Sequence, residues 1–233
     1  MKASDAPTTL APLEAYRLWA ATWDFDPSAV VALEASVLTG WLGDVRGQTV
    51  VDAACGTGRW LSHLRARGAS ALGFDFSLPM LARAAAKADF AGGLAAADLR
   101  HLPLADRSAD LVLCTLALGH VPELDSGVRE LCRIVRPGGA LLITDFHPDA
   151  ARRGWRRTFR SGGTTFEIEN YPYSKDELLT LAGRAGLELE ELCEPGFGDT
   201  QREIFRAAGK EALFEEVRGL PAVLAARWRR PCS

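Results

Sequence analysis

The sequence lacks the features that would place the protein in a membrane or on nucleic acid. Its 233 residues include no apolar run near the length of about 18 residues that a membrane-spanning helix needs. They begin without the pattern of a secretory leader, so we expect a cytoplasmic protein. The formal net charge of −3 gives no general attraction to nucleic acid.

Metal ligands are also scarce. The five cysteines and four histidines are scattered along the chain. No Cys-x-x-Cys pair occurs, and no set of cysteines and histidines has the spacing of zinc ligands. We therefore expect reduced cysteines and no bound metal.

The hydrophobic content of 48% is sufficient for one substantial core. Residues 1–9 are polar, and we expect a disordered tail there. We expect residues 10–233 to form a single domain. Its N-terminal part, residues 10–42, reads as two helices, the second with Asp26 as N-cap, and residues 149–173 read as a lid that contains a β-hairpin.

Strand-like and helix-like segments alternate over most of the chain. The predicted strands cover residues 49–54, 69–74, 93–97, 111–115, 140–144, 187–193 and 222–228. The predicted helices between them cover residues 58–67, 78–88, 124–135, 175–186, 201–208 and 210–217, with caps at Ser77 and Ser174. Such alternation predicts a mostly parallel seven-stranded sheet with helices on both faces, which brings the strand-end loops to one edge.

A glycine loop joins the first predicted strand to its helix. The segment Val50 to Leu61 reads VVDAACGTGRWL, with Gly56 and Gly58 in the turn. A strand, a glycine turn and a helix in this order form an anion site, because unpaired N–H groups and the helix dipole face the turn.

Acidic residues end the next two predicted strands. Asp75 can accept hydrogen bonds from the two hydroxyls of a ribose, and Asp98 can accept from an adenine amine. The Leu99 N–H can reach the adenine ring, while Phe76 and Met80 offer apolar surface to its face. These residues follow strands whose ends share one edge, so the pattern indicates a nucleoside site.

Five motifs carry a resemblance to the class I S-adenosylmethionine-dependent methyltransferases, in the small-molecule branch that includes ubiquinone- and menaquinone-pathway enzymes. They are VDAACGTG (51–58), GFDFS (73–77), ADLRHLP (97–103), SADLV (108–112) and ELCRIVRPGG (130–139). The resemblance implies a Rossmann-like sheet whose last strand is antiparallel. It also implies S-adenosylmethionine as cofactor, a small-molecule acceptor as partner and in-line methyl transfer.

The resemblance further implies which residues hold the cofactor. Tyr16 and Trp23 would close over it, where an aromatic face attracts a sulfonium. Asp52 would orient the loop, and the Ala53 carbonyl would accept from the cofactor's ammonium. The complete predicted set is Tyr16, Trp23, Asp52, Ala53, Cys55, Gly56, Thr57, Gly58, Asp75, Phe76, Met80, Asp98, Leu99 and Thr115.

Two other readings of the glycine loop remain open. A dinucleotide oxidoreductase would have a third glycine where this chain has Leu61, and Trp60 would crowd the pyrophosphate. A protein that binds S-adenosylmethionine without methylating, or that catalyses another reaction on the same fold, would have the same motifs.

A general base is needed only where the acceptor arrives protonated. His120, after the fourth predicted strand, is the first candidate, and His147, after the fifth, is the second. Tyr171 and Tyr173 are further candidates. Five lid arginines can either grip an anionic acceptor or form a solvated face: Arg152, Arg153, Arg156, Arg157 and Arg160.

Overall fold

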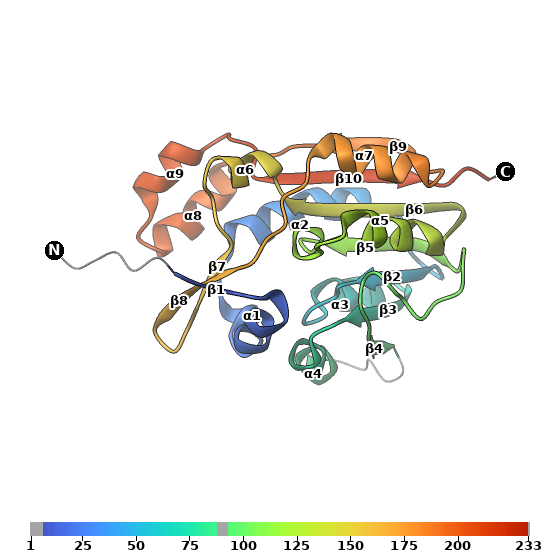
Figure 1. Ribbon diagram of the computed structural model, residues 1–233, viewed down its shortest axis with the longest axis horizontal. Coiled ribbons are helices and arrows are strands. Elements are labelled where there is room, and N and C mark those ends of the chain that lie inside the picture. The colour runs from blue at the N-terminus through green and yellow to red at the C-terminus, as the bar shows by residue number, and fades with distance from the viewer. Residues whose placement is uncertain (1–6, 88–92, 233) are drawn as a thin grey trace.

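The computed structural model describes residues 7–87 and 93–232 and contains a seven-stranded sheet flanked by helices (Figure 1). The strand order is β4-β3-β2-β5-β6-β10-β9. The large-sheet strands are β2 (Thr49–Ala53), β3 (Ser70–Asp75), β4 (Leu94–Ala96), β5 (Ala109–Thr115), β6 (Val135–Phe146), β9 (Glu188–Cys193) and β10 (Val223–Arg229). Only β10 runs antiparallel to its neighbours, so the predicted fold class is confirmed.

Helices cover both faces of this sheet. The α-helices are α1 (Pro12–Trp19), α2 (Ala29–Trp41), α3 (Arg59–Ala66), α4 (Leu78–Lys87), α5 (Leu124–Ile134), α6 (Pro148–Arg152), α7 (Lys175–Arg184), α8 (Asp199–Ala207) and α9 (Glu211–Val217). Two 3₁₀ turns, η1 (Trp23–Phe25) and η2 (Leu118–His120), lie near the strand ends. No helix in the described ranges is both long and apolar enough to cross a membrane.

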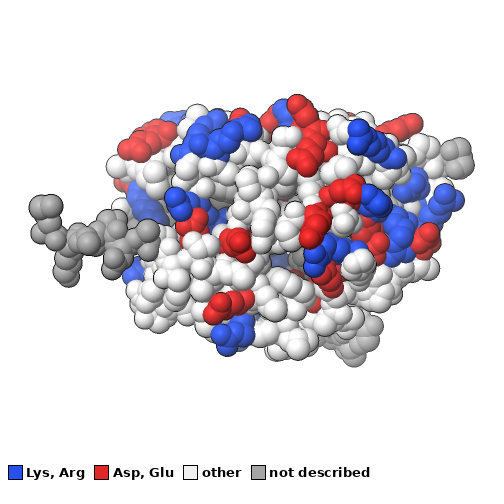
Figure 2. Space-filling view, viewed as in Figure 1, with Lys and Arg blue, Asp and Glu red and all other residues white. Residues whose placement is uncertain are grey.

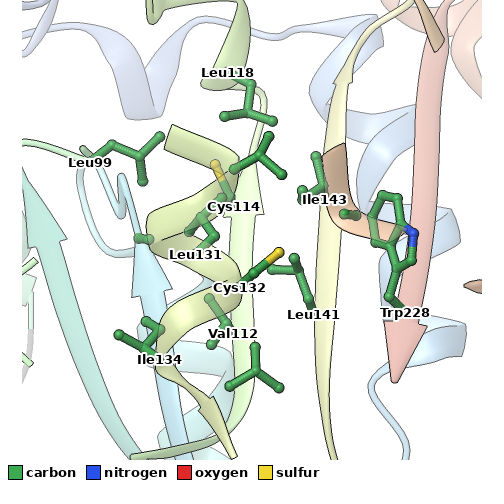
Figure 3. Close-up of a cluster of buried hydrophobic side chains, with 14 of the residues drawn as sticks. Leu99, Val112, Cys114, Leu118, Leu131, Cys132, Ile134, Leu141, Ile143 and Trp228 are labelled. Carbon is green, nitrogen blue, oxygen red and sulfur yellow. The ribbon is translucent and has the colours of Figure 1, made fainter. Parts of the chain in front are cut away.

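The central strands are apolar at successive positions because both of their faces are buried. On β5, Val112 and Cys114 belong to the core cluster beneath α5, whereas Leu111 and Leu113 belong to the cluster beneath α2 and α3. Figure 3 shows the first cluster, where Leu131 of α5 lies over β5 and β6. A continuous apolar run is therefore the expected signature of these strands.

A second, three-stranded sheet lies beside the strand ends. It joins β7 (Thr158–Ser161) and β8 (Thr164–Ile168), the predicted hairpin, with β1 (Thr8–Leu10) in the order β1-β8-β7. The prediction of a disordered tail is wrong at residues 8 and 9, because backbone pairing of β1 with β8 orders them. Residues 1–6 lie outside the described part, and the single-domain boundary at residue 10 remains a prediction.

Three local predictions differ from the structure. The α2 N-cap is Ser28, which accepts from the Val31 N–H, while Asp26 instead accepts from the Trp19 indole. The buried Ser77 hydroxyl has no hydrogen-bond partner, so it does not cap α4. The end of the predicted helix at Ala88 lies outside the described residues. The capping box of Ser174 and Glu177 on α7 is confirmed.

Candidate active site

A cavity of about 300 Å³ opens at the carboxyl ends of β2, β3, β4 and β5. The α1 helix and the segment after β8 cover it from the other side. Of the predicted site residues, eleven contribute to its lining: Tyr16, Trp23, Gly56, Asp75, Phe76, Met80, Asp98, Leu99, Thr115, His120 and Tyr171. Residues from distant parts of the chain therefore meet at one sheet edge, as the strand topology requires.

The glycine loop has the geometry of a backbone anion site. Gly56 and Gly58 both have positive φ, at 54° and 77°, and Gly58 is the N-cap of α3. A Cβ built on Gly56 would meet no atom within 4 Å, so the space in front of this backbone is open to a ligand. Ala53, Cys55, Thr57 and Gly58 are absent from the cavity lining and shape the loop from behind.

Ala54, which the sequence reasoning missed, lies in this loop with φ of 66° and lines the cavity. The left-handed region costs an L-residue with a Cβ about 1–2 kcal/mol. Glycine adopts it freely but loses more chain entropy on folding. The strain at Ala54 therefore sits directly against the space where a ligand would lie.

We expect Ala54→Gly to raise the free energy of unfolding by up to about 1 kcal/mol, because relief of the strain exceeds the added entropy cost. Urea unfolding measures the change. The control is Ala53→Gly, one residue earlier in β2 and fully buried, which should destabilise the protein. Equal effects of the two substitutions would contradict the strain at Ala54.

Asp75 ends β3 and faces the loop. Its Oδ2 accepts from the Gly56 N–H at 2.8 Å, and its Oδ1 accepts from the Ser77 N–H at 2.8 Å. Burial raises its pKa, and these two hydrogen bonds lower it. A carboxylate has four lone-pair sites, so Asp75 can still accept from two ligand hydroxyls.

Asp98 is placed differently, because its carboxylate is paired within the chain. Arg100 contacts both of its oxygens and also pairs with Glu123. The hydrogen bonds from Arg100 hold the pKa of Asp98 below its ordinary value. The side chain is 43% exposed, so one edge of it remains open to the cavity.

A buried acidic group supports the glycine loop from α2. Glu34 is fully buried and accepts from Arg59 at 2.7 Å and from the Trp60 indole at 3.1 Å. Asp52 lies on the same face of the sheet, outside the cavity lining, and its buried Oδ1 has no partner. Burial raises the pKa of Asp52 to about 7, while Arg59 opposes this shift. Arg59 itself lines the cavity.

His120 sits in η2 with both ring nitrogens bonded. Its Nδ1 lies 3.0 Å from the Glu169 carbonyl oxygen, which can only accept, so Nδ1 carries the proton. Its Nε2 then accepts from the Tyr16 hydroxyl and from Arg157, each at 2.9 Å. Burial, aided by the positive charge of Arg157, lowers the pKa of His120 to about 3.

The pH dependence of stability tests this assignment. The unfolded chain binds a proton at His120 near pH 6.5 and the folded protein only near pH 3. Protons therefore favour unfolding in this window, and the contribution of His120 to stability, complete above 6.5, is lost as pH falls toward 3. Asp52 has the opposite effect: its contribution to stability is lost as pH rises from its ordinary pKa of 3.8 to its folded pKa of about 7.

We therefore expect the wild type to lose stability relative to His120→Gln as pH falls from 6.5 toward 4. The contributions of all other titrating groups cancel in the difference between the two free energies of unfolding. Chemical unfolding at several pH values measures it. A stability difference that stays constant with pH would show that His120 titrates normally.

The structure does not bring His147 to the cavity. Its Nε2 contacts Glu194 at 2.8 Å, and its Nδ1 accepts from the Asp149 N–H as the N-cap of α6. Tyr173 is also buried away from the lining, where its hydroxyl donates to Asp145 at 3.0 Å. Sequence spacing could not distinguish these two side chains from Tyr171, which does line the cavity.

An internal ion pair joins the lid to the sheet, and the sequence reasoning did not single it out. Arg157, just before β7, pairs with Asp145 near the end of β6, and the two side chains are 12% and 1% exposed. Arg157 also donates to the Leu116 carbonyl oxygen at 2.7 Å. Leu116 has a positive φ of 55°, so this bond holds a strained residue of the cavity wall.

Comparisons with known proteins show which proteins this chain is similar to. Residues 51–143 match the family model described as a methyltransferase domain. A malonyl-[acyl-carrier protein] O-methyltransferase of Pseudescherichia vulneris is 41% identical over 110 residues, which are 47% of this chain and 43% of that protein. A demethylmenaquinone methyltransferase of Corynebacterium kroppenstedtii is 38% identical over 100 residues, 43% of this chain and 42% of that protein.

The chain thus spans less than half the length of these two relatives. A solved structure matches over more of the fold. The S-adenosylmethionine-dependent methyltransferase of Mesorhizobium loti aligns with a TM-score of 0.69 at 25% identity, over 88% of this chain and 99% of that one.

Proposed function

We propose that this chain, which belongs to the class I S-adenosylmethionine-dependent methyltransferases, transfers a methyl group from S-adenosylmethionine to a small-molecule acceptor. The single observation that carries the proposal is the convergence of the glycine loop, Asp75 and Asp98 on one cavity. Each of these features alone is common at strand ends. Together they match the amino-acid, ribose and adenine parts of this cofactor.

The residues present fit that cofactor. Open space faces Gly56, and Arg59 lies beside it, so the loop can receive a carboxylate. Asp75 keeps lone pairs for the ribose hydroxyls, and Phe76 and Met80 flank the adenine position. When bound, S-adenosylmethionine supplies a methyl carbon on a positively charged sulfur.

The chain's own contribution is to align the acceptor and to exclude water. Tyr16 and Trp23 of the N-terminal segment pack edge to face, with ring centroids 5.8 Å apart, and cover the cavity together with the segment after β8. His120 holds the Tyr16 hydroxyl through its unprotonated Nε2. We propose that His120 is a positioning residue, because a nitrogen with two donors and a pKa of about 3 is a poor base.

The acceptor is proposed to be a small molecule and not a nucleic acid, and the protein to act in the cytoplasm. Acidic and basic side chains are interspersed on the face shown in Figure 2, which therefore offers no extended positive surface to a phosphate backbone. A non-methylating reaction on the same fold, or binding without catalysis, is the alternative. The departure from the dinucleotide fingerprint at Leu61 disfavours NAD(P).

Calorimetric titration separates these possibilities. We expect S-adenosylmethionine and S-adenosylhomocysteine to bind, and NADH to show no binding at the same concentrations. Release of S-adenosylhomocysteine on incubation with an acceptor panel then distinguishes methyl transfer from binding alone. Binding of NADH without S-adenosylmethionine would overturn the proposal.

A further inference from the structure

The half of the cavity that remains for the acceptor is walled mainly by apolar groups. Ala11, Pro12 and Leu13 line it from the start of α1, and Val121 and Pro122 line it from the loop after η2. Leu13 is 52% exposed at this edge. Two polar groups beside them, Tyr16 and His120, are bonded to each other and carry no charge at neutral pH.

Among the residues that the structure describes, no unpaired positive charge lines this half of the cavity. Arg59 and Arg100 are the arginines among the described lining residues, and the lining contains no lysine. Arg59 lies at the glycine loop and pairs with Glu34. Arg100 is shared between Asp98 and Glu123, so its charge is more than compensated.

The lid arginines do not supply a cation either, although their density suggested an anion site. None of them lines the cavity. Arg152 pairs with Asp149, Arg156 pairs with Glu167, and Arg157 is buried against Asp145. These contacts favour the other reading of the arginine-rich lid, in which it has a structural role and a solvated face.

Negative charge remains at the same place. Glu169 follows β8, lines the cavity and forms no ion pair with any described residue. Tyr171 also lines the cavity, and the Glu169 carboxylate beside it raises the pKa of Tyr171. Glu123 lies close enough to raise it further. Three acidic groups therefore outnumber the single positive charge of Arg100: Asp98, Glu123 and Glu169.

We propose that the acceptor is an apolar molecule bearing an amine, and that Glu169 is the residue that selects its positive charge. This inference rests on the proposed function, because it assumes that the cofactor occupies the glycine-loop half of the cavity. An ammonium group beside Glu169 gains a charge-assisted hydrogen bond. A carboxylate or phosphate there meets an uncompensated negative charge and no cation.

Matched ligands test the selection without relying on turnover. The protein is saturated with S-adenosylhomocysteine and titrated calorimetrically with sets that share one body and differ in one group. Phenyl, indolyl and n-hexyl bodies are used, each as the ethylamine, the corresponding alcohol and the corresponding carboxylate. At least one amine is expected to bind about tenfold more tightly than its alcohol, as for a hydrogen bond to a charged group, with no binding of the carboxylates.

Substitutions assign the preference to one side chain. Glu169→Gln should remove the difference between amine and alcohol, and Glu169→Lys should favour the carboxylate. The matched control is Glu167→Gln, two residues away in β8, whose carboxylate pairs with Arg156 outside the lining and whose loss should leave the preference intact.

The inference is overturned if no amine binds more tightly than its alcohol, if a carboxylate binds as tightly as its amine, or if the preference survives in Glu169→Gln. The titration with S-adenosylhomocysteine distinguishes failure of the proposed function from failure of the proposed role of Glu169. Absence of S-adenosylhomocysteine binding defeats the proposed function itself, whereas binding of S-adenosylhomocysteine without an amine preference defeats only the role of Glu169.

Discussion

Arg157→Met is expected to lower the free energy of unfolding by about 3–5 kcal/mol, the largest change foreseen for a single lid residue. The substitution leaves the Asp145 carboxylate at 1% exposure without its cation. The remaining donors to that carboxylate are neutral: the Gly119 N–H at 2.6 Å, the Phe146 N–H at 2.7 Å and the Tyr173 hydroxyl at 3.0 Å. Urea unfolding followed by tryptophan fluorescence measures the loss.

The neighbouring arginine provides a matched control. Arg156 also pairs with a carboxylate, that of Glu167, but its side chain is 60% exposed. Arg156→Met should therefore cost at most about 1 kcal/mol. In the double variant Arg157→Met/Asp145→Leu, removal of both charges should recover much of the loss. Similar costs for Arg156→Met and Arg157→Met would show that burial does not set the importance of this pair.

The second large effect is expected at the cofactor. Asp75→Asn should weaken the binding of S-adenosylmethionine by about 1.5–3 kcal/mol, or roughly 10- to 150-fold, because an amide cannot accept from backbone and ribose at both of its ends. Asp75 already accepts from the N–H groups of Gly56 and Ser77, so the substitution also disturbs the loop that we propose receives the cofactor's carboxylate. Calorimetric titration measures the affinity.

Asp98→Asn is the control for that experiment, because Asp98 lies just after β4, the strand beside β3, but shares its oxygens with Arg100. Its effect on affinity should be smaller than that of Asp75→Asn. Unfolding curves for both variants establish that the proteins are folded. An unchanged affinity in Asp75→Asn would mean that the ribose lies elsewhere in the cavity.

The sequence by itself determined the sheet and predicted which residues meet in the proposed cofactor half of the site. Strands such as Leu111 to Thr115 bury both faces, so their apolar runs are legible without a structure. Parallel connections then bring Gly56, Asp75 and Asp98 to one edge. This half of the site depends on position along strands, which local sequence encodes.

Only the tertiary structure decided the chemistry of the other half. Local sequence shows that His120 and His147 follow strands, but not that Arg157 and Tyr16 occupy the Nε2 of one and Glu194 that of the other. It likewise could not show that Ala54 adopts a left-handed conformation.

The role of the lid arginines also depends on partners that only the folded protein brings to them. Their spacing is compatible with an anion site, yet their partners come from Asp145, 12 residues before Arg157, and from Glu167, 11 residues after Arg156. The net charge that a ligand meets is the sum of the arginine charges and the charges of the carboxylates that pair with them. Coulombic pairing depends on separation in space and on burial, so a charge that is prominent in the sequence can be fully compensated in the folded protein.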